Sequence, residues 1–168
     1  MESLRELLAS DQRRTLEFFF VGLQELSEPT VDRDELLYNA SVLAHHAQVS
    51  TQATTEMPTP GNLTAVFDAF VLNTSLVRDS AMMEVAGAQC LLLAGFFEDQ
   101  MRARHTIQWY AALGAHFYRL AAAHDRSSNR ARLLKAVSRK FEPWRRRHAQ
   151  LSRELRDQHY LLTPPAIM

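Results

Sequence analysis

The chain has 168 residues, a length typical of one domain that can bury a hydrophobic core. Hydrophobic residues make up 46% and charged residues 23% of the chain, a balance that excludes a disordered or fibrous protein. The formal net charge is zero, and the single cysteine, Cys90, excludes an intramolecular disulfide framework and favours a reducing compartment. The first residues lack a basic segment followed by an apolar stretch, so we expect no secretory signal and a cytoplasmic protein.

Helical spacing dominates the first half of the chain. An amphipathic pattern predicts a first helix that ends before Pro29, and its apolar stripe consists of Leu16, Phe19, Phe20 and Leu23. Asp32 and Glu35 have the spacing of a capping box and predict the start of a second helix. Residues 50–61 are rich in Thr and Pro and predict a mobile loop, after which a helical stripe resumes over residues 63–71.

The stretch VAGAQCLLLAGFF, from Val85 to Phe97, contains a single polar side chain. Because Glu84 precedes it and Glu98 follows it, the stretch is shorter than the roughly 20 apolar residues that a membrane-spanning helix needs. A helix over about 79–97 has no continuous polar face, and a helix that is apolar on all sides lies inside a protein. We therefore predict a buried central helix and no membrane partner.

The last third of the chain predicts a mostly buried helix over residues 106–124 and a basic helical region over about 128–159. The apolar residues of the basic region repeat as a heptad seam: Leu134, Val137, Phe141, Trp144, His148, Leu151 and Leu155. Pro143 interrupts the seam, so we expect a kink, or a break at Phe141–Glu142 with Pro143 at the first position of a new helix. About six helices and no predicted strand indicate a single-domain all-α bundle over residues 1–168.

Residues 91–121 resemble a group of uncharacterised bacterial all-α proteins. The shared pattern is an apolar helix that ends in Gly-Phe-Phe, an Arg-rich link, and a Tyr-x-x-x-Gly-x-x-x-Tyr helix. The matching positions are Gly95, Phe96, Phe97, Arg102, Arg104, Tyr110, Gly114 and Tyr118. The resemblance implies a bacterial cytoplasmic protein, and it brings with it no known activity and no catalytic residue.

Motifs for metal and cofactor chemistry are missing from the sequence. It has no paired Glu-x-x-His motifs, no His-Glu-x-x-His motif, no glycine-rich phosphate loop and no Gly-x-Ser-x-Gly elbow. Cys90 lies inside the predicted central helix, where a buried thiol behaves as a small hydrophobic group. We therefore predict no metal, no cofactor and a structural role for this cysteine.

Glu84 is the one candidate for catalysis, because an unpaired buried carboxylate is costly. The structural interpretation is an ion pair or hydrogen bond with Arg78, Arg119 or a tyrosine hydroxyl. The catalytic interpretation is a general acid or base in a pocket, where burial tunes its pKa. The weak candidates for its partners in that pocket are His116, Tyr110 and Tyr118.

Charge divides the chain into two parts. Residues 1–125 hold 8 Lys/Arg and 16 Asp/Glu, a net charge of −8, whereas residues 126–168 hold 11 and 3, a net charge of +8. In the basic part, four arginines recur every seven residues and therefore lie along one line of a helix, opposite the seam: Arg132, Arg139, Arg146 and Arg153. The line would extend roughly 30 Å. Its flanking cations are Arg145, Arg147, Lys135 and Lys140.

This arginine line predicts either a solvated helix face or an anion-binding stripe. An acidic cluster of Glu25, Glu28, Asp32, Asp34 and Glu35 offers it a counterpart within the chain or across a homo-oligomer. We expect a non-enzymatic adaptor or regulatory protein that binds a partner protein through its basic C-terminal helix. A nucleic-acid-binding regulator that uses the same arginines is the alternative, although the sequence pI of about 7.1 is low for such a domain. An enzyme with a Glu84/His116 pocket is the third hypothesis.

Overall fold

The computed structural model describes residues 12–51, 79–101 and 104–155. These residues form six α-helices: α2 (Gln12–Glu25), α3 (Arg33–Thr51), α5 (Ser80–Leu91), α6 (Arg104–His124), α7 (Ser128–Arg139) and α8 (Phe141–Glu154). The described part of the chain contains no strand, which confirms the predicted all-α bundle. The stripe predicted over residues 63–71 lies outside the described residues, as does the predicted loop except for Ser50 and Thr51, the last two residues of α3.

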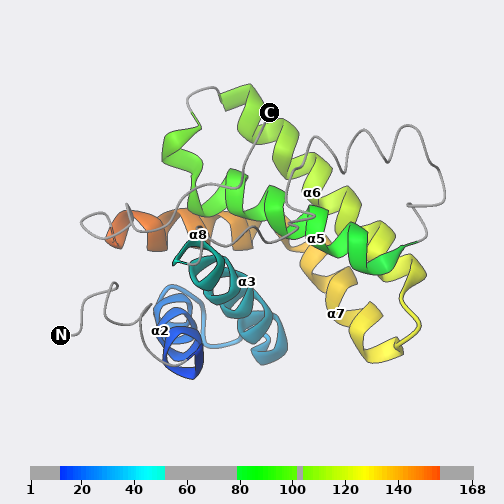
Figure 1. The fold of residues 1–168 in the computed structure, drawn as a ribbon, viewed down its shortest axis with the longest axis horizontal. Helices are drawn as coiled ribbons and strands as arrows, with labels where there is room; N and C mark the ends of the chain where they lie inside the picture. The colour runs from blue at the N-terminus through cyan, green and yellow to red at the C-terminus, as the bar shows by residue number, and fades with distance from the viewer. Residues whose placement is uncertain (1–11, 52–78, 102–103, 156–168) are drawn as a thin grey trace.

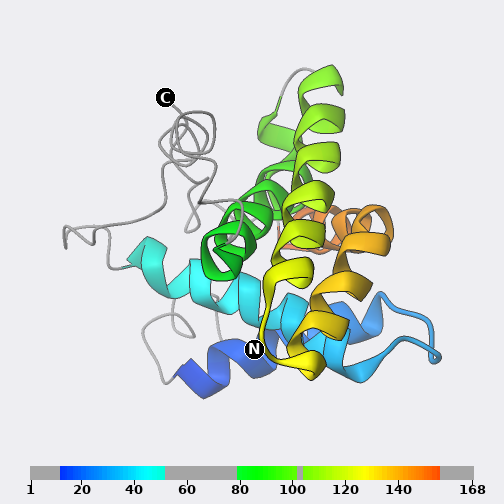
Figure 2. The ribbon, with the colours of Figure 1, turned by 90° about the vertical axis from the view of Figure 1, so that its right-hand side faces the viewer.

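The helices pack around α5, which lies in the middle of the molecule (Figure 1). α6 runs along one side of α5 and leads by a short turn into α7, whereas α2 and α3 form a separate pair below α5 (Figures 1 and 2). α8 crosses behind the end of α5. Within the described residues, no helix has the length and apolar character that crossing a membrane requires.

The predicted central helix is confirmed by its burial. Asp79 caps α5 by accepting a hydrogen bond from the Met82 amide at 3.1 Å. Every residue from Cys90 to Phe97 is buried. This segment serves two hydrophobic cores, one with α6 and α7 and one with α2, α3 and α8, and therefore has no polar side. The double packing is the physical reason for the apolar sequence.

The central segment changes its helical winding where the two cores meet. After Leu91 the chain forms a π-helix over Leu92–Phe96, in which the Phe97 amide donates to the Leu92 carbonyl at 2.9 Å. A 3₁₀ turn, Glu98–Gln100, follows. The sequence predicted one continuous helix here, because a π turn has no signature in the hydrophobic pattern.

Gly114 allows α6 to approach α5 and α8 closely. A Cβ atom at this position would lie 2.5 Å from Cζ of Phe141 and 2.7 Å from Cβ of Cys90. These distances are too short for any side chain, so packing alone explains the glycine in the Tyr-x-x-x-Gly-x-x-x-Tyr pattern.

The predicted interruption of the basic region is a break at Lys140, and the new helix begins two residues earlier than expected. α7 ends at Arg139 and α8 begins at Phe141 in a different direction (Figure 1). Pro143 is therefore the third residue of α8 and not the first; its missing N–H costs no hydrogen bond, because the first four N–H groups of a helix have no partner within it. The Trp144 amide still donates to the Lys140 carbonyl at 3.1 Å. The seam consequently keeps its phase: all its members are buried except Leu155, which is half-buried.

Replacement of Leu92 by Ala tests the central position of this segment. Because Leu92 is only 4% exposed, we expect the free energy of unfolding to fall by about 2–5 kcal/mol, measured by urea denaturation. Val21, which is 49% exposed, is the control, and its replacement by Ala should change this free energy by no more than about 0.5 kcal/mol. Equal effects of the two substitutions would contradict a buried centre.

Candidate functional site

Glu84 links four helices of the bundle. The Tyr38 hydroxyl of α3 donates to Oε1 of Glu84 at 3.1 Å, and Nη2 of Arg130 on α7 donates to Oε2. The Tyr38 and Tyr118 hydroxyls hydrogen-bond each other at 3.1 Å, which brings α6 into the network. The prediction that Glu84 has a charged or hydroxyl partner is confirmed. Of the arginines named from the sequence, Arg119 contacts His116 instead, and Arg78 lies outside the described residues.

The protonation of this network favours a structural role. Burial raises the pKa of both the Tyr38 and Tyr118 hydroxyls well above the ordinary value, so both remain protonated at neutral pH. Glu84 accepts from one hydroxyl and one guanidinium, and its carboxylate is thereby satisfied on both oxygens. The arrangement holds α3, α5, α6 and α7 in register.

An open hollow of about 570 Å³ lies beside Glu84. Its lining residues are Asp79, Ser80, Ala81, Glu84, His124, Asp125, Arg126 and Arg130. Of the four residues named for a catalytic pocket, Glu84 lines this hollow, whereas His116, Tyr110 and Tyr118 do not.

The three proposed partners lie in different surroundings. His116 accepts at Nδ1 from Arg119 at 2.7 Å, and its pKa is lowered by burial and then by the Arg119 charge. Tyr110 packs against Trp109, and Tyr118 reaches Glu84 only through Tyr38. In the part of the chain that the structure describes, no group of His, Cys, Asp or Glu side chains could hold a metal ion. The Cys90 thiol is buried, and burial raises its pKa.

The four arginines of the predicted line are all exposed, but the break between α7 and α8 divides them into two pairs. On α8, Arg146 pairs with Glu142 at 3.2 Å, and Arg153 pairs with Glu98 at 2.9 Å. On α7, Arg132 and Arg139 form no ion pair with any described residue. The straight stripe of roughly 30 Å is therefore not formed.

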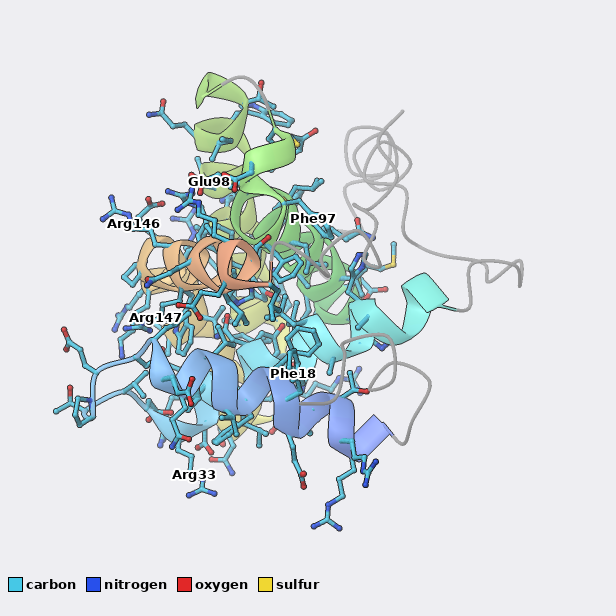
Figure 3. All side chains as sticks on the ribbon, turned by 90° about the vertical axis from the view of Figure 1, so that its left-hand side faces the viewer. Phe18, Arg33, Phe97, Glu98, Arg146 and Arg147 are labelled. Carbon is cyan, nitrogen blue, oxygen red and sulfur yellow. The ribbon has the colours of Figure 1, made fainter. Side chains whose placement is uncertain are left out.

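The flanking arginines of α8 differ in burial: Arg145 is buried, whereas Arg147 is half-buried. Arg145 is 9% exposed, contrary to the expectation that it borders an exposed stripe. Its guanidinium donates to the Ala94 carbonyl at 3.0 Å, to Glu98 at 3.1 Å and to Glu142 at 2.9 Å. Arg147 stacks over the Trp144 ring at 4.4 Å, on the side of α8 that faces α2 (Figure 3). Arg146 points away from the body of the molecule.

Two buried polar contacts attach α3 to the end of α7 and to α8. Glu35 accepts from Nζ of Lys140 at 3.1 Å and from the Trp144 indole at 3.2 Å. Asn39 accepts from Nε2 of His148 at 2.9 Å, and burial lowers the pKa of this histidine, so the ring is neutral with its proton on Nε2. Glu35, one member of the acidic cluster, therefore pairs with Lys140 within the chain.

What remains is a compact basic face on α7, formed by Arg132, Lys135 and Arg139. All three side chains are exposed, and none forms an ion pair with the described residues. Their spacings of three and four place them on one side of the helix. Neither α7 nor the neighbouring α6 contains an acidic residue.

No family model, curated protein or solved structure matches the chain in the comparisons with known proteins.

The adjacent residues Arg145 and Arg146 provide a matched pair for a stability test. Arg145→Gln leaves the buried Ala94 carbonyl without its guanidinium donor and removes one of the two guanidinium partners of Glu98, and we expect a loss of about 1–3 kcal/mol. Arg146→Gln removes an exposed pair and should cost no more than about 1 kcal/mol. Thermal melting and urea denaturation of both variants measure the difference. A similar small effect of both would show that Arg145 is not a structural residue.

Because of His148, we expect the stability of the protein to decrease as the pH falls. Burial, and then the Arg147 charge, lower its pKa from 6.5 to about 3, so the folded protein keeps the ring neutral. The unfolded chain takes up a proton below pH 6.5; the stability contributed by the neutral ring is complete above that pH and is lost as the pH falls toward 3. We expect about 1.4 kcal/mol to be lost per pH unit in this window.

Urea denaturation at several pH values between neutral and mildly acidic checks this expectation. The His148→Gln variant is the control, because it has no imidazole to protonate. Its free energy of unfolding should depend less on pH than that of the wild type. Identical pH profiles would show that His148 does not cause the acid sensitivity.

Proposed function

We propose that the protein is a non-enzymatic adaptor or regulatory protein that binds an acidic surface of a partner protein through the basic face of α7. One observation carries the proposal: Arg132, Lys135 and Arg139 are exposed on one helix side and have no ion pair among the described residues. Of the cations on α8, Arg145, Arg146 and Arg153 are neutralised by Glu98, Asp99 and Glu142, and Arg147 stacks over the Trp144 ring. The contrast favours a surface kept for an external anion over a merely solvated face.

The size of this face favours a protein partner over nucleic acid. From Arg132 to Arg139 the helix rises only about 10 Å. Nucleic-acid binding relies on many phosphate contacts and on a strongly basic domain, whereas this chain has no net charge. Exposed carboxylates on a partner protein match three cations at helical spacing. We include in the proposal a bacterial cytoplasmic setting, for which the sequence resemblance and the single cysteine are the support.

A labelled peptide rich in Asp and Glu tests the proposal by fluorescence anisotropy. The wild-type protein should bind it at low salt, and Arg132→Gln/Arg139→Gln should weaken binding by about tenfold, since each exposed ion pair is worth up to about 1 kcal/mol. The melting temperature should stay unchanged. The control is Gln108→Glu/Gln150→Glu, which makes the same change in net charge at exposed positions of α6 and α8 and should bind as the wild type does.

Two results would contradict the proposal. Equal weakening by the α7 variant and by the control would mean that only net charge matters. Preferential binding of a DNA duplex, with an affinity that falls steeply with salt and depends on the same arginines, would favour the nucleic-acid alternative.

A further inference from the structure

The turn between α2 and α3 forms an exposed acidic surface. Its four carboxylates are those of Glu25, Glu28, Asp32 and Asp34, which we call the acidic turn. All four residues are exposed, and none forms an ion pair with the described residues. The one cation of this region, Arg33, lies 5.9 Å from the centre of the Phe20 ring. The acidic turn therefore resembles the basic face in being exposed and without an ion pair among the described residues, but its charge is negative.

Exposed apolar side chains lie close to the acidic turn. Val21, near the end of α2, is 49% exposed, and Leu37, near the start of α3, is 45% exposed. Both are within about two helical turns of the carboxylates. Apolar groups beside charges of one sign are suited to a contact in which charge gives orientation and apolar area adds affinity.

Among the described residues, no ion pair joins the acidic turn to the basic face of the same molecule. Lys140 follows Arg139 directly and points toward α3, where it pairs with Glu35 at 3.1 Å. Arg132 and Lys135 lie on the same side of α7 as Arg139. None of the three forms an ion pair with a described residue, so both charged surfaces stay open.

We propose that the acidic turn of one molecule binds the basic face of α7 on a second copy of the same chain. The inference rests on the proposed function, since it assigns an occupant to the same face. Four carboxylates would meet three cations, which gives charge complementarity without a bound ion. Two such contacts made reciprocally give a two-fold dimer, whereas a single head-to-tail contact leaves one open surface of each kind and gives rings or short chains.

Size-exclusion chromatography with light scattering, at low and high salt, tests the assembly. The wild type should associate with rising concentration at low salt and dissociate at high salt, where exposed charges are screened. Arg132→Glu/Arg139→Glu alone and Glu25→Lys/Glu28→Lys alone should each stay monomeric. Their equimolar mixture should associate again, because the first variant keeps an intact acidic turn and the second keeps an intact basic face. Gln108→Glu/Gln150→Glu should associate as the wild type does.

Zero-length carbodiimide cross-linking separates this contact from general attraction between oppositely charged variants. In a mixture of isotopically light and heavy wild-type chains, Lys135 should be joined to a carboxylate of the acidic turn on another chain. Intermolecular cross-links that avoid both surfaces would overturn the inference.

The two proposals fail in distinguishable ways. A wild type that stays monomeric at low salt, but binds the acidic peptide through α7, would reject the second copy as the occupant and leave the proposed function intact. A monomer whose α7 variant also binds the peptide normally would reject both.

Discussion

The fold depends on the guanidinium of Arg145. The π-helix at Leu92–Phe96 places the Ala94 carbonyl within reach of α8, and Arg145 donates to it while it also binds Glu98 and Glu142. A buried cation is tolerable only when carboxylates and carbonyls surround it in this way. Arg145 therefore fixes the end of the central segment against α8. The close approach is possible because a Cβ atom at Gly95 would already lie 3.0 Å from the Arg145 carbonyl oxygen.

The attachment of α8 to the central segment through Arg145 determines which cations remain available to bind other molecules. With α8 held against the central segment, Arg153 lies beside Glu98 and Asp99, and Arg146 lies beside Glu142. The break at Lys140 turns α7 away from these carboxylates, and the acid-free α6 beside it offers none. The charges on α8 therefore stabilise the fold, whereas those on the basic face of α7 do not. The regularly spaced arginines of the sequence therefore form two groups in the structure: those on α8 stabilise the fold, and those on α7 do not.

The spacing of apolar residues in the sequence predicts the helices and their buried faces. It does not predict which side chains, far apart in the chain, pair in the folded structure. The seam, the buried central segment and the interruption near Pro143 follow from apolar spacing, because burial selects residues by face. The sequence also shows that Glu84 needs a partner. It cannot show that Tyr38 and Arg130 supply it, since they lie 46 residues away on either side. Arg145 and Arg146 are adjacent and chemically identical, and only the packed structure separates a buried anchor from an exposed side chain.

The separation of the acidic and basic residues in this neutral chain costs little folding free energy. Lys140 and Glu35 show that the chain can pair its basic and acidic parts, and that pair is partly buried against Trp144. Further pairs of exposed side chains would each add only about 0–1 kcal/mol to stability. Leaving the basic face and the acidic turn open therefore sacrifices little folding free energy. At physiological salt the Debye length is about 8 Å, so each surface acts only on a molecule in near contact. Charges held at helical spacing are then recognised through their arrangement.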